Sequence, residues 1–409
     1  MAVTPGVRLV AIGPPLALVD DDAAAVATAL AAGGVAVESR TLVEEDEAAL
    51  ERALTPPTTL TVLLTGPGGS TGDVVRRVLA RATGTRLVLN ERMLAALEAQ
   101  ARRRDRPLPR RDERLALLPQ GAIAWTDGEP AWALETDAAA WVVLPRGGLG
   151  AATTDALIDF ARARLGRGGA VAARTLRTAG VALADVETRL AAWLGPGEAG
   201  GDVVATAVPT DGEVWVRLRA RGATPEAAAG TLAKAERDIT HALGADCYGR
   251  DADLLEQVVG RQLVARALTL AVAESCTGGL VGHRLTGIAG SSAFFERGVI
   301  VYSNRAKQEL LGVPEEILRV HGAVSRPCAE AMVRGICERS GAACGLSITG
   351  IAGPDGGTPT KPVGTVFIGV AVPGALEALQ FRFAGSRAAV KWQSSQVALD
   401  MLRRRLGGV

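Results

Sequence analysis

Hydrophobic and polar residues alternate along the first part of the chain in the way that predicts strands followed by helices. Residues 7–13 form an apolar run of strand length, and residues 20–34 begin with three aspartates and end with two glycines. Acidic residues stabilise the positive end of a helix dipole, and glycine is favoured just after a helix. A strand and a glycine-rich turn at 60–73 are again followed by a helix. This alternation predicts a parallel sheet with helices on its faces.

A glycine-rich break at 166–170 leads into a segment with a different pattern. Residues 186–195 and 224–244 predict helices, and residues 213–222 predict a strand between them. Side chains alternate along a strand, which leaves this one with a single apolar face. That face consists of Val214, Val216 and Leu218. We interpret the segment as a compact α+β module.

The last part of the chain returns to strands that alternate with helices. A helix opens it, and a strand at 268–274 leads to an SCTGG turn at 275–279. Two later helices have serine at the N-cap, Ser325 and Ser386. The opening helix has an apolar stripe formed by Leu254, Leu255, Val258, Val259 and Leu263. This pattern predicts a further α/β domain.

At 409 residues the chain is too long for one hydrophobic core, so several domains are expected. We place them at 1–167, 168–250 and 251–409 and assign the chain to the multidomain α/β class, with the α+β module in the middle. Its 45 basic and 44 acidic residues nearly cancel. That balance predicts no broad basic surface for nucleic acid or for an anionic membrane.

Cysteine and histidine usage argues against disulfides and metal ligands. The chain has 5 cysteines, an odd number without a CxxC pair, so reduced thiols in the cytoplasm are expected. The histidines, His241, His283 and His321, are far apart, and we expect neither a metal nor another cofactor. The first residues lack the pattern of a signal peptide, and no uncharged apolar stretch reaches the ~18 residues of a membrane span.

The SCTGG turn has two chemical interpretations. Gly278 and Gly279 join a strand to a helix and expose backbone N–H groups, which together with the helix dipole can hold a phosphate or an oxyanion. A hydroxyl at this place, from Ser275 or Thr277, can act as a nucleophile if a base removes its proton. The alternative is that one of these hydroxyls only caps the helix, since Ser and Thr are preferred N-caps. The turn by itself leaves both interpretations open.

Three further stretches carry candidate chemistry. Tyr302 at a strand end and Lys307 on the next helix are candidates for an activating pair. Burial can lower the pKa of a lysine enough to make it a base. The alternative is that Lys307 lies on the surface. The glycine-rich loop at 347–365 suits a nucleotide-like ligand but lacks the GK[ST] ending of a P-loop, and its alternative is a long turn. Arg387 begins the final helix, where it can clamp an anion or lie on the surface.

These four stretches lie in one block of the chain, each at the C-terminal end of an expected strand or at a helix start. In open α/β sheets that edge is where ligands bind. We therefore expect the four stretches to meet in one site.

The block resembles the CinA C-terminal family, the nicotinamide mononucleotide amidohydrolases. The matching motifs, in chain order between residues 251 and 409, are AESCTGG, GSSAFFERGVIVYSNRAKQELLGV, HGAVS, SITGIAGPDGGTPTKPVGTV and GSR. The resemblance implies hydrolysis of the carboxamide of nicotinamide mononucleotide to the acid and ammonia, without a required metal or other cofactor.

The resemblance also implies roles for individual residues. Ser275 would be the nucleophile, with Tyr302 and Lys307 as its activating pair. Backbone N–H groups of the SCTGG turn, or of the loop after Thr349, would stabilise the oxyanion. Thr349 and the loop at 350–357 would line the nucleotide site. The residues expected to bind substrate are Thr277, Gly278, Gly279, Asn304, Thr349, Gly350, Gly353, Gly356, Lys361 and Arg387.

The whole chain resembles full-length members of the CinA family. Its middle module resembles the KH-like domain, and its first domain resembles the molybdopterin-binding-like domain, which hydrolyses ADP-ribose with a metal in some members. Three motifs of the first domain depart from the family pattern, reading GPPLALV at 13–19, GPGGSTGDV at 66–74 and LPRGG at 144–148. The second motif keeps Asp73 but has Val74 in place of a carboxylate, although divalent metals need such oxygen ligands. We expect this domain to be a structural remnant.

Two positions in the last block also depart from the family, since Ser386 and Lys391 stand where an aspartate and an arginine are common.

Two other functions remain open. One is a bifunctional enzyme with a working ADP-ribose pyrophosphatase domain, and the other is a non-catalytic partner in DNA uptake or repair. The balanced charge argues against a partner in DNA uptake or repair, because DNA binding requires a basic surface. We expect a cytoplasmic homo-oligomer that acts on a small nucleotide, with no nucleic-acid or membrane partner.

Overall fold

The computed structural model of the chain describes residues 4–13, 21–65, 70–103, 105–146, 150–165, 170–194, 203–210 and 212–407. They form two compact units, one of Met1–Ala173 with Arg219–Leu232 and the other of Arg174–Leu218 with Ala233–Val409. Several sheets with helices packed on them confirm the predicted multidomain α/β class. The boundaries at 167 and 250 stay predictions.

The first unit is built on a sheet with the strand order β2-β1-β3-β8-β7-β6. The parallel strands are β1 (Thr4–Ile12), β2 (Val37–Val43), β3 (Thr58–Thr65) and β8 (Ala140–Pro145). Their pairing confirms the predicted parallel sheet, to which the antiparallel strands β7 (Ala131–Glu135) and β6 (Ile123–Trp125) add one edge. The connections at 126–130 and 136–139 are too short for a crossover helix, so these strands pair as hairpins.

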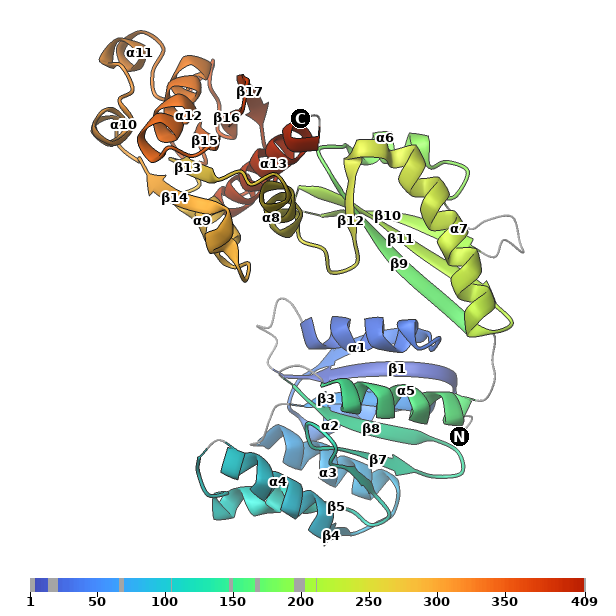
Figure 1. Ribbon diagram of the computed structural model, residues 1–409. Helices are drawn as coiled ribbons and strands as arrows, with labels where there is room; N and C mark the ends of the chain where they lie inside the picture. Colours follow the sequence, from blue (N-terminus) through green and yellow to red (C-terminus); the bar gives the residue numbers. More distant parts are fainter. Residues whose placement is uncertain are drawn as a thin grey trace. The chain divides into compact units, whose positions relative to one another are not determined.

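Helices cover both faces of this sheet (Figure 1). The helices of one face are α1 (Asp21–Ala32) and α5 (Ala151–Leu165), and those of the other are α2 (Glu47–Ala53), α3 (Ser70–Ala82) and α4 (Glu91–Arg103). The smaller elements are η1 (Arg110–Ala116) and the antiparallel pair of β4 (Leu87–Leu89) and β5 (Leu117–Pro119). Each face has its own cluster of buried aliphatic side chains, as expected for a three-layer α/β arrangement.

The middle module is a sheet with the strand order β10-β11-β9-β12. Its strands are β9 (Ala170–Ala179), β10 (Val203–Thr210), β11 (Glu213–Gly222) and β12 (Cys247–Arg250), and its helices are α6 (Leu183–Arg189), α7 (Pro225–Leu243) and the short η2 (Gly244–Asp246). The predicted apolar face of β11 is confirmed, since Val214, Val216 and Leu218 are all buried. The predicted helix at 186–195 begins earlier and ends at Arg189.

The last domain has the strand order β14-β13-β15-β16-β17. The strands β13 (Leu270–Glu274), β14 (Phe295–Ile300) and β15 (Cys344–Gly350) are parallel, and β16 (Thr365–Val372) and β17 (Ala375–Arg382) are antiparallel to their neighbours. One face carries α12 (Arg326–Ser340), against which α10 (Asn304–Leu311) and α11 (Glu315–Val320) pack. The other carries α8 (Leu255–Ala265), α9 (Leu280–Thr286) and α13 (Arg387–Gly407), and η3 (Ser291–Ala293) precedes β14.

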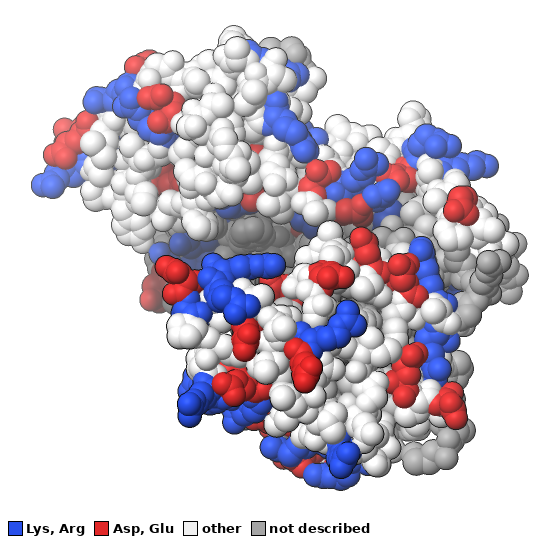
Figure 2. Space-filling view, turned by 60° about the horizontal axis from the view of Figure 1, so that its bottom comes forward, with Lys and Arg blue, Asp and Glu red and all other residues white. Residues whose placement is uncertain are grey.

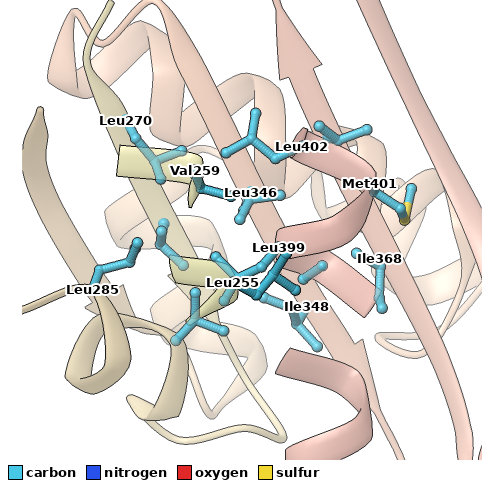
Figure 3. Close-up of a cluster of buried hydrophobic side chains, with 14 of the residues drawn as sticks. Leu255, Val259, Leu270, Leu285, Leu346, Ile348, Ile368, Leu399, Met401 and Leu402 are labelled. Atoms are coloured by element: carbon cyan, nitrogen blue, oxygen red, sulfur yellow. The ribbon is translucent and has the colours of Figure 1, made fainter. Parts of the chain in front are cut away.

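The core of the last domain joins α8 and α13 to the sheet. Leu255 and Val259 of α8 and Leu399 and Leu402 of α13 lie among the strand side chains in Figure 3. Of the predicted apolar stripe of α8, Leu255, Val259 and Leu263 are buried. Leu254 is exposed because it precedes the helix as its N-cap. Both predicted serine caps are confirmed, because Ser325 and Ser386 accept hydrogen bonds from backbone N–H groups three residues later.

Charged side chains of both signs are interspersed over the face in Figure 2, without a broad field of one sign. Among the described residues, no helix is both long and apolar enough to cross a membrane.

Candidate active site

The candidate residues follow strands that end at one edge of the last sheet. Glu274 at the end of β13 is paired in register with Ile300 of β14 and with Ile348 of β15. Ser275 therefore lies beside the segment after β14 and the loop after β15, as expected for parallel strands. Tyr302 was predicted to end a strand, but β14 stops at Ile300, so this residue lies in the connection to α10.

Ser275 and Lys307 form a buried hydrogen-bonded pair. The Lys307 Nζ lies 3.1 Å from the Ser275 Oγ, although 32 positions separate the two residues in sequence. The side chain of Lys307 is 1% exposed and that of Ser275 is 8% exposed. Lys307 lies on α10 one turn after Ser303, whose hydroxyl caps the helix by accepting from the Ala306 N–H. The interpretation of Lys307 as a surface lysine is therefore wrong.

Burial favours the neutral form of the Lys307 amine. Burial removes water from the ammonium group and lowers the pKa of Lys307 below its ordinary value of 10.5. Its Nζ also donates to the Val301 carbonyl at 2.7 Å and to the Tyr302 carbonyl at 3.3 Å. A neutral amine has two N–H donors and one lone pair. When the amine is neutral, donation to these two carbonyls leaves its lone pair for the Ser275 hydroxyl, whose proton it can then remove.

Glu274, which lies in the AESCTGG motif, is a structural residue of the site to which the sequence analysis assigned no role. This carboxylate is 2% exposed and accepts hydrogen bonds from the backbone N–H groups of Gly279 at 3.0 Å, Val281 at 3.2 Å and Gly282 at 2.8 Å. A negative charge stabilises the first turn of a helix because it satisfies donors that have no partner within the helix. The signal in the sequence was a carboxylate ending an otherwise apolar strand directly before the turn.

The interpretation of Ser275 or Thr277 as a helix cap is wrong. The N-cap of α9 is Gly279, which has a left-handed φ of 93° and makes no side-chain cap bond. The N–H groups of Gly279, Val281 and Gly282 are already bonded to Glu274, so they are not available to a phosphate or an oxyanion. Within the SCTGG turn this corrects the oxyanion expectation for the Gly279 N–H, and for the other N–H groups of the turn it stays a prediction. For the loop after Thr349 it stays a prediction.

Thr277 lies in the same turn, between the serine and the two glycines. Its side chain is fully buried, and within the described part of the chain its Oγ1 has no hydrogen-bond partner. Gly278 next to it has a left-handed φ of 62°, a conformation that favours glycine because it has no β-carbon. A β-carbon added to Gly278 would lie 3.7 Å from the Lys391 Nζ, so the ammonium of α13 lies close to the turn.

Tyr302 and Arg387 form a second group of contacts at this edge. The Arg387 guanidinium donates to the Tyr302 hydroxyl at 3.2 Å and to the Gly353 carbonyl at 2.7 Å. The side chain of Tyr302 is 64% exposed, and its contact with Lys307 is made by its backbone carbonyl. The structure thus places the phenol beside Arg387. Its role in activating Ser275 stays a prediction.

Other expected substrate residues hold the glycine-rich loop in place. Thr349 is buried and its hydroxyl donates to the Ala323 carbonyl at 2.8 Å. A β-carbon on Gly350 would lie 2.6 Å from a methyl group of Val366, so this glycine allows close packing. The Lys361 Nζ donates to the His321 carbonyl at 3.0 Å.

Asn304 and Gly356 complete the expected set. Asn304 is the exposed first residue of α10, and Gly356 has a left-handed φ of 87° in the exposed loop. No described contact links either residue to the Ser275–Lys307 pair. Their substrate roles stay predictions.

The thiols near the site do not compete with Ser275 as nucleophiles. All 5 cysteines are free. Burial raises the pKa of the Cys276 thiol to about 12, and it raises that of Cys328 to about 11. At neutral pH both thiols are therefore protonated, and the thiolate is the reactive form. Among the described residues, no three His, Cys, Asp or Glu side chains come together in a way that could hold a metal ion.

The carboxylate retained in the first domain is bound by arginines. Asp73 at the start of α3 forms a close ion pair with the buried Arg76, and Arg114 Nη1 lies 3.3 Å from its other oxygen. Two guanidinium groups thus neutralise the charge that a metal would need. The motif at 13–19, except Gly13, and residues 66–69 and 147–148 of the other two motifs lie outside the described residues.

Comparison with known proteins identifies similar chains and domains. The sequence model of the CinA C-terminal domain matches residues 252–406, and that of the damage-inducible protein CinA KH domain matches residues 173–249. A CinA-like protein of Gemmatimonas aurantiaca is 37% identical over 97% of this chain and 96% of its own length. A CinA-like protein of Geobacter sulfurreducens is 38% identical over 95% of each chain. Among solved structures, the competence damage-inducible protein A (ComA) from Klebsiella pneumoniae has 38% sequence identity to this chain. The match covers 37% of this chain and 95% of the ComA chain, with a TM-score of 0.37.

Proposed function

The chain belongs to the CinA family, and from this premise we propose that its last domain hydrolyses the carboxamide of nicotinamide mononucleotide to nicotinate mononucleotide and ammonia. The observation that carries the proposal is the buried pair of Ser275 Oγ and Lys307 Nζ, 3.1 Å apart, with the lysine pKa lowered by burial. A serine beside a neutral amine is the arrangement that acyl transfer requires.

The proposed reaction proceeds through an ester on Ser275. The neutral amine of Lys307 takes the hydroxyl proton while Oγ forms a bond to the carboxamide carbon. The C–N bond then breaks, and the Lys307 ammonium returns the proton to the departing nitrogen, which leaves as ammonia. A water molecule, deprotonated by Lys307, attacks the ester. The ester C–O bond then breaks, the Lys307 ammonium returns the proton to the Ser275 Oγ and the acid leaves, so one amide bond and one water are consumed.

Unpaired positive charge near the turn supports a phosphorylated substrate. Arg387 contacts a carbonyl and a hydroxyl, and Lys361 contacts a carbonyl. Lys391 lies next to Gly278. Within the described part of the chain, no carboxylate forms a salt bridge with Arg387, Lys361 or Lys391, although many other arginines do. We propose that these cations bind the phosphate, with Lys391 in the place of the family's arginine.

We propose that the first domain does not hydrolyse ADP-ribose, because Asp73 is bound by Arg76 and Arg114. We further propose that the protein is a cytoplasmic homo-oligomer without a nucleic-acid partner. Neither proposal is needed for the amidase chemistry of the last domain.

The test is to follow ammonia release from nicotinamide mononucleotide, nicotinamide riboside and free nicotinamide by the purified full-length protein. We expect turnover of the mononucleotide, with a large loss of kcat/KM for the riboside, which lacks the phosphate. Turnover of none of the three, at any pH between 6 and 10, would contradict the proposed reaction. Equal turnover of all three would contradict the phosphate site.

A further inference from the structure

The helix that follows the catalytic turn is held at both ends by buried polar side chains. α9 spans only Leu280–Thr286, and a helix this short is not stable by itself, so its position depends on its contacts. Glu274 binds its first turn. Arg284 lies in its last turn, and the side chain of this arginine is buried although it carries a charge.

Arg284 is fixed by groups from two other helices. Its Nη1 donates to the Ser395 hydroxyl at 2.7 Å and its Nη2 donates to the Glu256 carboxylate at 2.6 Å. The Nη2 also donates to the Gln396 side-chain oxygen. The ring of Trp392 lies 4.5 Å from the guanidinium carbon, in the position for a cation–π contact. The end of α9 is thereby tied to α8 and α13.

The amide of Gln396 connects this arginine to the middle module. Its Nε2 donates to the Glu213 carboxylate of β11 at 2.6 Å. An arginine only donates and an ionised carboxylate only accepts, so the two partners permit a single orientation of the amide. The turn before β11 packs closely here, because a β-carbon on Gly212 would lie 3.2 Å from the Gln396 Cγ.

Glu213 is itself held firmly by its own module. Its carboxylate accepts from the Tyr248 hydroxyl at 2.7 Å and from the Trp215 indole N–H at 2.5 Å, and Arg177 Nε lies 3.3 Å away. Its side chain is 8% exposed. A displacement of β11 is therefore transmitted to Gln396 and to the guanidinium of Arg284.

We propose that Gln396 is a positioning residue, which links Glu213 of the middle module to α9 and so holds the turn that carries Ser275. The inference rests on the proposed function, since it names a residue that places the nucleophile for that reaction. It also gives the middle module a role in the amidase. A shift of about 1 Å in a nucleophile can reduce a rate by about 100-fold.

The test exchanges donor and acceptor across this contact. Gln396→Glu places two carboxylates face to face, and we expect kcat to fall by about 10- to 100-fold with a smaller change in KM. The double variant Glu213→Gln with Gln396→Glu restores one donor and one acceptor, because the Tyr248 hydroxyl can turn to accept from the new amide. We expect it to recover kcat to within about threefold of the wild type. Gln380→Glu, the same change on the exposed edge strand β17, serves as control and keeps wild-type kcat.

Hydrogen exchange separates this inference from the proposed reaction. In Gln396→Glu we expect the amides of residues 279–286 to exchange at least about tenfold faster, with recovery in the double variant. Unchanged exchange in this segment, or a double variant no better than the single one, would overturn the positioning role. Faster exchange in a protein whose wild type releases no ammonia would leave the link intact and refute only the proposed reaction.

Discussion

At the scale of single residues, the proposed chemistry depends on the one lysine that is buried. Lysine occurs only at Lys234, Lys307, Lys361 and Lys391, although the chain has 45 lysines and arginines together. Arginine cannot lose its proton in a protein, so it cannot replace a lysine that acts as a base. The scarcity of lysine was visible in the sequence. The burial of Lys307 was not, because it depends on where β14 ends and α10 begins.

Replacing Lys307 separates stability from activity. Its pKa is lower in the folded protein than in the unfolded chain, so between the folded pKa and 10.5 the unfolded state binds more protons and the free energy of unfolding rises with pH. Lys307→Met removes that penalty. We expect a higher thermal midpoint than wild type at pH 7, a difference that shrinks toward pH 10, and a loss of about 1,000-fold or more in kcat.

Thermal unfolding at several pH values measures this difference, and Lys234→Met on the exposed face of α7 is the matched control. A Lys307→Met protein that is less stable than wild type at neutral pH would show that the buried amine stabilises the fold.

The same shift predicts how the rate depends on pH. Lys307 acts in its neutral form, so kcat/KM for ammonia release should rise with pH and level off above the pKa of Lys307, which lies below 10.5. A pH–rate profile between pH 5 and pH 10 measures this limb. A rate that falls steadily across the same range would mean that the protonated lysine is the active form.

At the scale of elements, the sequence predicted the order of strands and helices well and their hydrogen bonding less well. The SCTGG turn was correctly placed between a strand and a helix. Serine and threonine are the usual caps, but here Glu274 reaches forward from the strand and binds the helix N–H groups. Local preference cannot foresee a cap supplied from the preceding strand. Similarly, the hairpin at β6 and β7 depends on loop length rather than on strand pattern.

Two substitutions distinguish the cap from the nucleophile. Glu274→Ala leaves the N–H groups of Gly279, Val281 and Gly282 without their acceptor, and we expect the last domain to lose about 2 kcal/mol of stability. Ser275→Ala leaves Lys307 bonded to two carbonyls, so we expect a loss of less than about 1 kcal/mol. Denaturant unfolding of both variants compares them. The reverse order would restore Ser275 as the cap.

At the scale of the whole molecule, family resemblance placed the site in the last domain, and the fold brought Ser275 and Lys307 together there. Glu213 and Gln396 could not be paired from sequence, since 183 positions separate them. Departures from the family motifs also led to the prediction that the first domain has lost its metal chemistry. The pairing of Asp73 with Arg76 and Arg114 supports that proposal, and this pairing depends on side-chain packing that the motif does not encode.

The first domain provides a prediction of its own. The full-length protein should release no ribose 5-phosphate from ADP-ribose with Mg²⁺, Mn²⁺ or Co²⁺. Asp73→Ala leaves the buried Arg76 without its carboxylate, so its effect should be on stability, about 1–3 kcal/mol allowing for the partial exposure of Asp73. Metal-dependent turnover that Asp73→Ala abolishes would establish the bifunctional alternative.

The most direct measurement compares ammonia release from nicotinamide mononucleotide by the wild type, Ser275→Ala and Ser340→Ala. Ser340 bonds to backbone groups at the opposite ends of the strands, so its variant controls for the loss of a hydroxyl from the same domain. We predict wild-type kcat for Ser340→Ala and a loss of about 1,000-fold or more for a folded Ser275→Ala. A Ser275→Ala protein that still turned over at the wild-type rate would contradict the account.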